Sequence, residues 1–448
     1  MKVGISYTPE GAPCIYLCSM SRIHLIAIGG SAMHNLALEL HAQGHQVSGS
    51  DDKIFSPSRE RLDGPGLLPT EGWDASRIDQ EIDLIILGMH AHADNPELRR
   101  AQELGLRILS YPEFIFEQSQ AQTRVVVAGS HGKTSITSMI LHVMHKVGQQ
   151  VNYLVGAQLP GFDRMVRLDP QADFIIIEGD EYGSSALDPR PKFHWYEPNI
   201  ALISGIAWDH ANIFPTEEEY QEQFASFVRE IKPGGTLVFC EEDIDLKALV
   251  EANADEIKLF PYRSALAEPS ASGSILHTEE GEVPLRIFGA HNMQNLEGAR
   301  LVCNQLGVMD DEFYAAITDF EGASRRLEMI ADDDRGCFYR DFAHAPSKVK
   351  ATVEAVRRQF KGRKLIAVLE LHTYSSLNPS FLPQYKGSLS MADRALVYFD
   401  PEVVKQKRLP ALDAEALQRH FDQRGLEVFT GMDELKTQLE ADYGKNAV

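Results

Sequence analysis

Short apolar runs alternate with helical patterns along most of the chain. Clear runs are Ile23–Ile28, Val125–Ala128, Phe174–Ile177 and Ala201–Ser204, each with the length of a buried strand. After the second run, apolar residues recur at offsets of 0, 3, 4, 7, 8 and 11 from Ile136, which places them on one helix face. Alternating strands and helices predict an α/β fold with parallel, doubly wound sheets, which bind ligands at the carboxyl ends of their strands.

Interruptions of this pattern divide the chain into three predicted domains. The polar segment Glu117–Thr123 predicts a linker between the first two. We expect a Rossmann-like domain over residues 1–121, a central P-loop ATPase-type domain over residues 122–322 and a C-terminal Rossmann-like α/β domain over residues 323–448. The Pro/Ser/Gly-rich stretch Glu268–Ser274 predicts a surface loop.

The first domain has the order strand, glycine turn, helix, strand. Ile23–Ile28 enters the turn Gly29–Met33, and the strand Gln46–Ser48 leads to Asp51. An acidic residue about 20 positions after a glycine turn is typical of a nucleotide-binding βαβ unit. The turn lacks a full G-x-G-x-x-G pattern, so a nicotinamide oxidoreductase is kept only as an alternative.

The junction after Val125–Ala128 is the most informative stretch of the chain. Gly129–Thr134 reads GSHGKT and lies between the apolar run and the helical pattern. Backbone N–H groups at such a turn attract phosphate oxygens, Lys133 can reach terminal phosphates, and a threonine hydroxyl can ligate Mg²⁺. Val127 stands where the first glycine of GxxxxGK[ST] belongs, so the alternative is a glycine-rich turn that binds nothing.

Two further strands of the central domain lead to residues suited to metal or phosphate chemistry. Phe174–Ile177 ends at Glu178, and Asp209-His210 begins five residues after the run that ends at Ser204. Mg²⁺ prefers oxygen ligands and keeps several waters, so one or two carboxylates suffice to bind it. The alternatives are a solvated acidic turn for Glu178 and a structural histidine for His210.

Three more polar stretches are candidates, although their spacing alone assigns them no role. Asp341 and His344 follow a predicted strand, and they could grip a ligand or cap the helix that begins near Ser347. Gly289–Asn295 opens a helix whose amides could contact a base. An arginine from Arg325-Arg326 could enter from the third domain and neutralise charge on a transferring phosphoryl group.

Composition narrows the partners and the compartment. The net charge of −22 over 448 residues argues against a nucleic-acid partner. The five cysteines are scattered, with no CxxC pair, as in a reducing cytosol. No run reaches the ~18 apolar residues of a membrane span, and Met1–Met20 makes a poor signal peptide. We therefore expect a cytoplasmic protein without membrane insertion.

Together these segments resemble the Mur ligase family, the ATP-dependent amide-bond ligases of peptidoglycan synthesis. The resemblance extends from about Arg22 to about Asp400, with the motifs in family order. The family's loop, G-[ST]-[HKN]-G-K-T-[ST], normally lacks the early glycine of the Walker pattern, which accounts for Val127. The family's D-[YF]-[AG]-H-[HNT]-P motif has Ala345 at its penultimate place here.

The resemblance implies three groups of site residues. ATP would contact Gly129, Ser130, His131, Gly132, Lys133, Thr134, Ser135, His291, Asn292, Asn295, Arg325 and Asp341. The uridine nucleotide would contact Gly29, Gly30, Ser31, Ala32, Met33 and Asp51. One Mg²⁺ would be held by Thr134 and Glu178 and a second by His210, and the catalytic residues would be Lys133, His210, Arg326 and His344.

Within the family, the chain is most similar to the two members that act on UDP-N-acetylmuramate. One adds L-alanine, and the other adds the recycled tripeptide L-alanyl-γ-D-glutamyl-meso-diaminopimelate. Trp208–Phe214 and Glu370–Leu377 resemble the tripeptide-adding member more closely, because the alanine-adding member usually has an arginine-containing H-[RQ]-[FY]-[ST]-R. We expect His372, Tyr374 and Ser375 to contact the peptide, and keep the alanine-adding activity as the alternative.

The resemblance also implies a mechanism. The muramyl carboxylate attacks the γ-phosphate, and the peptide amine then attacks the resulting acyl phosphate, which domain closure protects from water. The segment Ala211–Ile231 contains no lysine, so we expect none of the carbamoylated lysine that other members carry. We expect a monomer or weak homodimer. A nucleotide-sensing module that has lost catalysis is a further alternative.

Overall fold

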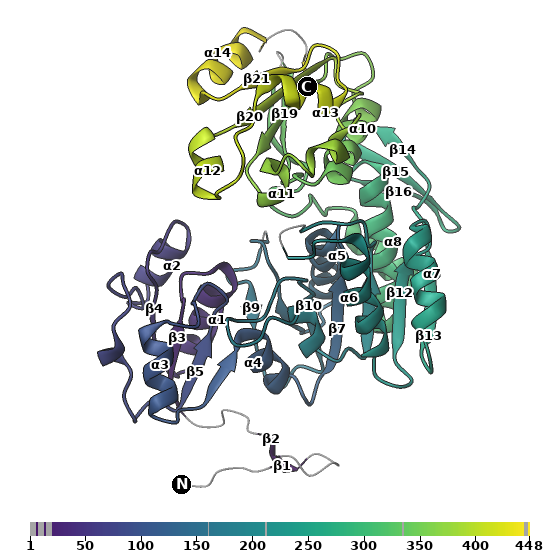
Figure 1. The fold of residues 1–448 in the computed structure, drawn as a ribbon. Coiled ribbons are helices and arrows are strands. Elements are labelled where there is room, and N and C mark those ends of the chain that lie inside the picture. Colours follow the sequence, from purple (N-terminus) through teal and green to yellow (C-terminus); the bar gives the residue numbers. More distant parts are fainter. Residues whose placement is uncertain are drawn as a thin grey trace.

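The computed structural model describes residues 6–7, 13–14, 20–159, 161–210, 213–333, 336–442 and 447–448, which form three α/β units (Figure 1). The first unit contains a four-stranded parallel sheet in the order β4-β3-β5-β6. Its elements are β3 (Arg22–Ile26), α1 (Ser31–Ala42), β4 (Gln46–Ser50), α2 (Ser58–Asp63), β5 (Leu84–Leu87), α3 (Pro96–Glu103), β6 (Ile108–Ser110) and α4 (Tyr111–Gln118). Before it, β1 (Ser6–Tyr7) pairs with β2 (Pro13–Cys14).

The central unit is built on a seven-stranded sheet in the order β13-β12-β11-β7-β10-β8-β9. All neighbouring strands in this sheet are parallel except the last pair. The strands are β7 (Thr123–Ala128), β8 (Asn152–Leu154), β9 (Val166–Arg167), β10 (Phe174–Glu178), β11 (Ile200–Ile203), β12 (Thr236–Cys240) and β13 (Lys258–Tyr262). The helices are α5 (Lys133–Lys146), α6 (Glu217–Arg229), α7 (Ile244–Asn253), α8 (Ala290–Gln305) and α9 (Asp310–Ile317).

The predicted phosphate loop lies at the centre of this sheet. The predicted strand is β7, and the predicted helix is α5, which begins at Lys133 and buries Ile136, Met139 and Ile140. Because β7 lies between β10 and β11, the loop at its carboxyl end lies next to the segments that follow those two strands. The sequence order of strand, glycine turn and helix is confirmed.

Two predictions of local structure are wrong. The stretch Glu268–Ser274 is not a loop, because β14 (Ala267–Ser270) and β15 (Gly273–Thr278) pair there and continue to β16 (Gly281–Leu285) in an antiparallel sheet. Pro269 is tolerated because β14 is an edge strand. The predicted linker Glu117–Thr123 is shorter than expected, because α4 continues to Gln118 and β7 begins at Thr123.

The third unit lies over the central unit near α10, as Figure 1 shows. Its parallel sheet has the order β19-β20-β21, beside an antiparallel hairpin of β17 and β18. The elements are β17 (Glu328–Asp333), β18 (Gly336–Arg340), α10 (Pro346–Gln359), β19 (Ile366–Leu371), α11 (Tyr374–Leu377), β20 (Arg394–Phe399), α12 (Pro401–Gln406), α13 (Ala414–Phe421), β21 (Glu427–Phe429) and α14 (Met432–Asp442). Ala447 forms isolated β-bridges to Gly336, at the start of β18, and to Lys364, two residues before β19.

The apolar cores of the units are connected differently. One continuous cluster of buried side chains extends through the first and central units and includes Leu36 and Val126. The third unit has a separate cluster around Leu369 and Phe421. Within the described residues, no helix is long and apolar enough to cross a membrane.

Candidate active site

The phosphate loop has the backbone geometry of a cradle. Gly129 has φ +124° and Gly132 has φ +72°, values that favour glycine. A Cβ at Gly132 would lie 2.2 Å from Asn295 Oδ1, so the amide of α8 closes against the loop. The loop therefore presents backbone N–H groups and the N-terminus of α5 to one space, as an anion-binding turn does.

Lys133 is held by a carboxylate that the sequence analysis did not place in the site. Its Nζ donates to Glu181 Oε2 at 2.6 Å and to the Gly129 carbonyl at 2.6 Å. Burial alone would lower the pKa of Lys133, but the carboxylates, Glu181 first, raise it. Glu181 is 1% exposed, and although burial opposes ionisation, Lys133 and His210 lower its pKa. The two side chains therefore form a buried ion pair.

Thr134 and Glu178 are paired directly. The threonine hydroxyl donates to Glu178 Oε1 at 2.7 Å, and Oε2 accepts from the backbone N–H of Gly156 at 2.8 Å. A hydroxyl and a carboxylate beside a phosphate cradle fit Mg²⁺, which takes its remaining ligands from water and phosphate. Strand β10 delivers Glu178 as the sequence predicts. Its partner Thr134 lies in the first turn of α5, the helix that follows the adjacent strand β7.

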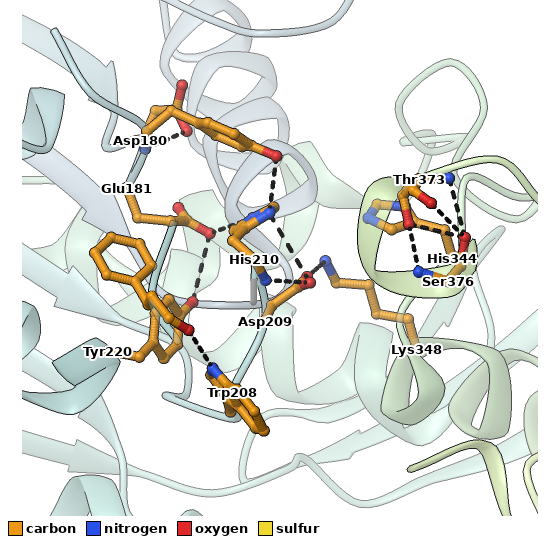
Figure 2. A network of polar contacts seen from close by, with 12 residues as sticks. Asp180, Glu181, Trp208, Asp209, His210, Tyr220, His344, Lys348, Thr373 and Ser376 are labelled. Atoms are coloured by element: carbon orange, nitrogen blue, oxygen red, sulfur yellow. Dashed lines mark hydrogen bonds and ion pairs between the residues drawn. The ribbon is translucent and has the colours of Figure 1, made fainter. Parts of the chain in front are cut away.

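His210 lies at the centre of a polar network (Figure 2). Its Nε2 lies 3.1 Å from Glu181 Oε1, and its Nδ1 lies 2.9 Å from the Tyr182 hydroxyl. Because a carboxylate only accepts, Nε2 carries a proton and donates it to Glu181. Both ring nitrogens are thus engaged, and His210 would have to release one partner to bind a metal ion. The next motif residues, Ala211 and Asn212, lie outside the described part of the chain.

Asp209 and the third unit face each other across the site. Asp209 is 3% exposed, and its Oδ1 accepts from the backbone N–H of His210 at 2.7 Å. Its Oδ2 has no hydrogen-bond partner among the described residues, but lies 3.5 Å from Nζ of Lys348 on α10. Burial lowers the pKa of Lys348. The carboxylate of Asp209 acts in the opposite direction, and the positive charges of Lys133 and Arg326 lower the pKa further.

Two other contacts join the third unit to the phosphate loop. His131 Nε2 lies 2.7 Å from the Ser347 hydroxyl, and Arg326 donates to the Thr134 hydroxyl at 3.4 Å. The guanidinium of Arg326 also lies over the Phe342 ring at 5.1 Å. An arginine of the third unit therefore reaches the Thr134–Glu178 pair, as the resemblance implied.

Asp341 and His344 do not cap α10, the simpler alternative left open above. The helix begins at Pro346, one residue before the predicted start near Ser347, and the described residues provide no side-chain cap. Asp341 accepts from the Leu327 N–H at 3.2 Å and from the Thr352 hydroxyl at 2.5 Å. Burial first, and then Lys348, lower the pKa of His344 to about 4. The same two causes lower the pKa of His131 to about 4, so both imidazoles are neutral at pH 7.

These contacts surround one cavity of about 460 Å³ between the central and third units. The predicted residues that line it are Ser130, His131, Gly132, Lys133, Thr134, Ser135, Glu178, His210, His291, Asn292, Asn295, Arg326, Asp341 and His344. Lys348 and Glu181 line it as well and were not predicted. Arg325 is not in this lining; its backbone is in the left-handed region, and its N–H donates to Glu328 at 2.8 Å.

The glycine turn of the first unit forms a separate site. Asp51 Oδ2 accepts from the Gly29 N–H at 2.8 Å, so the acidic residue and the turn meet at the carboxyl ends of β3 and β4. Burial raises the pKa of Asp51 to about 6. Gly30 and Ser31 begin α1, and Met33 is buried beneath the turn. The juxtaposition predicted from spacing is present.

The predicted peptide residues lie on the third unit. His372 is 5.9 Å from His344 and 6.0 Å from Phe342 between ring centroids. Tyr374 is partly exposed at the start of α11, whereas Ser375 is buried. The contact of His372 with His344 connects this loop to the cavity, and its role toward a peptide stays a prediction.

Known proteins match the whole of this arrangement. Residues 22–123 match the model of the Mur ligase family catalytic domain, residues 127–303 that of the Mur ligase middle domain, and residues 325–448 that of the Mur ligase glutamate ligase domain. A ligase of Escherichia coli K12, UDP-N-acetylmuramate–L-alanyl-gamma-D-glutamyl-meso-2,6-diaminoheptandioate ligase, is 31% identical over 359 residues, 78% of each chain.

Two further relatives show how evenly the similarity is divided. A UDP-N-acetylmuramate–L-alanine ligase of Mycobacterium marinum is 30% identical over 427 residues, 90% of this chain and 85% of that one. The crystal structure of a murein peptide ligase from Psychrobacter arcticus superposes with a TM-score of 0.69 at 25% identity, covering 95% of this chain and 94% of that one.

The fold and the site define an ATP-dependent ligase that forms amide bonds, with three α/β domains and parallel strands in each. The chain belongs to the Mur ligase family, whose members act in peptidoglycan synthesis.

Proposed function

We propose that this ligase joins the tripeptide L-alanyl-γ-D-glutamyl-meso-diaminopimelate to the carboxylate of UDP-N-acetylmuramate, in peptidoglycan recycling. The observation that carries the reaction type is the convergence of Lys133, the Thr134–Glu178 pair and Arg326 of the third unit on one cavity. Cations and hydroxyl donors from two domains suit the attack of one anion on another.

The proposed reaction has two steps. A carboxylate oxygen of the sugar acid attacks the γ-phosphorus of ATP, the bond to the β,γ-bridging oxygen breaks, and ADP leaves. The peptide amine then attacks the acyl phosphate carbonyl, the carbon–oxygen bond to phosphate breaks, and the nitrogen loses a proton. Lys133 and Arg326 would neutralise phosphate charge, and the closed third unit would exclude water.

Mg²⁺ fits this site at Thr134 and Glu178. When bound, the ion would neutralise charge on the phosphate oxygens. A second ion at His210 would require that histidine to give up its contact with Glu181 or Tyr182. The described residues contain no cluster of three or more His, Cys, Asp or Glu side chains that could hold a metal by themselves, so phosphate and water must complete any coordination shell.

The choice of the tripeptide over L-alanine is supported by the loop after β19. Residues 372–377 read HTYSSL and lack the arginine that the alanine-adding member usually has there. The E. coli relative is named for tripeptide addition, and the M. marinum relative for L-alanine addition, at nearly equal identity. L-alanine addition is therefore the second candidate. We further propose domains over residues 1–121, 122–322 and 323–448, a monomer or weak homodimer, and a cytoplasmic location.

ADP release tests the proposal directly. The protein is supplied with ATP, Mg²⁺ and UDP-N-acetylmuramate, and turnover with L-alanine is compared with turnover with the tripeptide. Tripeptide-dependent release supports the proposal, and release with L-alanine alone replaces it with the second candidate. ATP binding without turnover favours the nucleotide-sensing alternative.

A matched pair of variants tests the assigned chemistry. Lys133→Ala should reduce ligation by at least about 10³-fold, because it removes a charge from the phosphoryl-transfer centre. Lys146→Ala, at the other end of α5, removes a surface ion pair with Asp319 and should change the rate little. Full activity of Lys133→Ala would exclude this mechanism.

A further inference from the structure

Lys348 is a partly buried cation with an incomplete set of partners among the described residues. It lies on the first turn of α10, and its side chain is 25% exposed. An ammonium group has three N–H donors, yet within the described residues its contact is one ion pair at 3.5 Å with Asp209 Oδ2. That oxygen is itself buried and has no hydrogen bond to any described residue. The pair is therefore close enough to attract but leaves donors and acceptor unsatisfied.

The cavity beside Lys348 contains both cationic side chains and carboxylates. Lys348 lines the same cavity as Lys133, Arg326 and Thr134. Its helix starts at Pro346, so the N-terminal end of α10 also faces this space. The carboxylates of Glu178, Glu181 and Asp341 in this cavity are bound to other groups. Within the described residues, the charged partner of Lys348 is therefore Asp209, and its remaining N–H donors are available to an anionic ligand in the cavity.

We propose that Lys348 leaves Asp209 and binds an anionic oxygen at the point where phosphoryl transfer takes place. That oxygen belongs to the terminal phosphoryl group of the nucleotide or to the sugar-acid carboxylate that it is transferred to. Asp209 holds the ammonium in the site until the substrates arrive. This inference rests on the proposed function and assigns to the third unit a second cation besides Arg326.

The position of Lys348 on α10 distinguishes it from the neighbouring lysine on the same helix. The Lys348 side chain extends from the third unit toward Asp209, on the side of the site where His210 lies (Figure 2). Lys350, two positions along the same helix, is exposed and does not line the cavity. It therefore provides a matched control with the same charge on the same helix.

Equilibrium binding separates the two anion sources without turnover. Affinities of the wild type, Lys348→Met and Lys350→Met are measured by calorimetry for ADP and for adenylyl imidodiphosphate, which has a terminal phosphoryl group. They are also measured for UDP-N-acetylmuramate and for UDP-N-acetylglucosamine, which lacks the carboxylate. Loss of one charge-assisted hydrogen bond should weaken the binding of the affected ligand roughly tenfold or more.

The expected result is a selective loss in Lys348→Met. Weaker binding of adenylyl imidodiphosphate with unchanged ADP identifies the phosphoryl group as the partner, and weaker binding of UDP-N-acetylmuramate with unchanged UDP-N-acetylglucosamine identifies the carboxylate. Lys350→Met should bind all four like the wild type. Equal affinities in Lys348→Met and the wild type for all four, or equal weakening of all four, would overturn the proposal.

Kinetics complete the test and separate it from the proposed function. Lys348→Met should lower kcat for ADP release, and Lys348→Arg, which keeps the charge, should recover part of the loss. A wild-type protein that turns over neither acceptor would contradict the proposed function. An active wild type matched by an equally active Lys348→Met would contradict only the role of Lys348.

Discussion

The two junctions between the domains are built in opposite ways. The first and central domains share one apolar core, and α1 hydrogen-bonds across the junction: Asn35 Oδ1 accepts from the Met165 N–H at 3.1 Å, and Glu39 accepts from the Leu168 N–H at 3.0 Å. The central and third domains meet at the cavity through polar contacts, such as His131 with Ser347, and their apolar cores are separate.

This difference indicates which domain moves. Separating the first two domains would expose a continuous apolar core to water. This exposure costs a free energy of about 25 cal/mol for each Å² of apolar surface. At the cavity, the third domain would break hydrogen bonds and ion pairs that water can replace. Two apolar contacts also cross this junction. Trp208 packs against both clusters with its ring 5.8 Å from Phe381, and Phe288 lies in the cluster of the third domain with its ring 5.5 Å from Tyr339. We therefore infer that the first two domains move as one body and the third opens and closes.

The largest expected effect comes from a substitution at the polar junction between the central and third domains. Arg326→Ala should lower kcat by roughly 10³-fold, as loss of an arginine at a phosphoryl-transfer centre does, and should leave the free energy of unfolding nearly unchanged. Steady-state ADP release and urea denaturation measure the two quantities. Arg358→Ala, an exposed arginine on α10, is the control. A rate loss below threefold would remove Arg326 from the reaction.

The next effect is on the apolar junction. Glu39→Ala should lower the free energy of unfolding by roughly 2–4 kcal/mol, because it leaves the Leu168 N–H and the Arg164 ion pair without their buried acceptor. Glu39→Gln keeps an acceptor for Leu168 and should lose less. Urea unfolding followed by fluorescence gives both values. Separate unfolding transitions for the first and central domains in the wild type would contradict the single rigid body.

A smaller effect is expected in the fluorescence of Trp208. In a Trp73→Phe, Trp195→Phe background, its emission should shift when adenylyl imidodiphosphate closes the third domain. A second background that keeps only Trp73, on the first domain, should respond little. Added salt should weaken the response of Trp208, because the closing contacts are charged. Equal responses from both tryptophans would show that the first domain moves too.

The smallest effect is the pH dependence that Asp51 contributes. Burial raises its pKa to about 6 in the folded protein, whereas the pKa of an aspartate in an unfolded chain is about 3.9. The protonated side chain therefore stabilises the fold below about pH 4, and this stability is lost as the pH rises through about 6. Asp51→Asn should abolish this part of the pH profile, measured as unfolding free energy from pH 4 to 7. An unchanged profile would show that Asp51 does not titrate in this range.

Most of the fold follows from local patterns. The strand Val125–Ala128 and the helix after it are predicted because apolar periodicity and glycine position are properties of neighbouring residues. The strands β14 and β15 are missed because proline and serine usually indicate a loop, whereas pairing with β16 supplies the hydrogen bonds that make a strand. The start of the linker is misplaced because α4 packs into the core as far as Ile115 and continues to Gln118.

The sequence by itself determined the phosphate loop, the carboxylate at the end of β10 and the acidic partner of the glycine turn, because short spacings along strands and turns define each of them. Only the tertiary structure decided that Glu181 holds Lys133 and that Lys348 faces Asp209. Those residues are distant along the chain, and no local pattern encodes their distance. They meet because parallel strands align their carboxyl ends and a third domain, with its own core, places its charges over them.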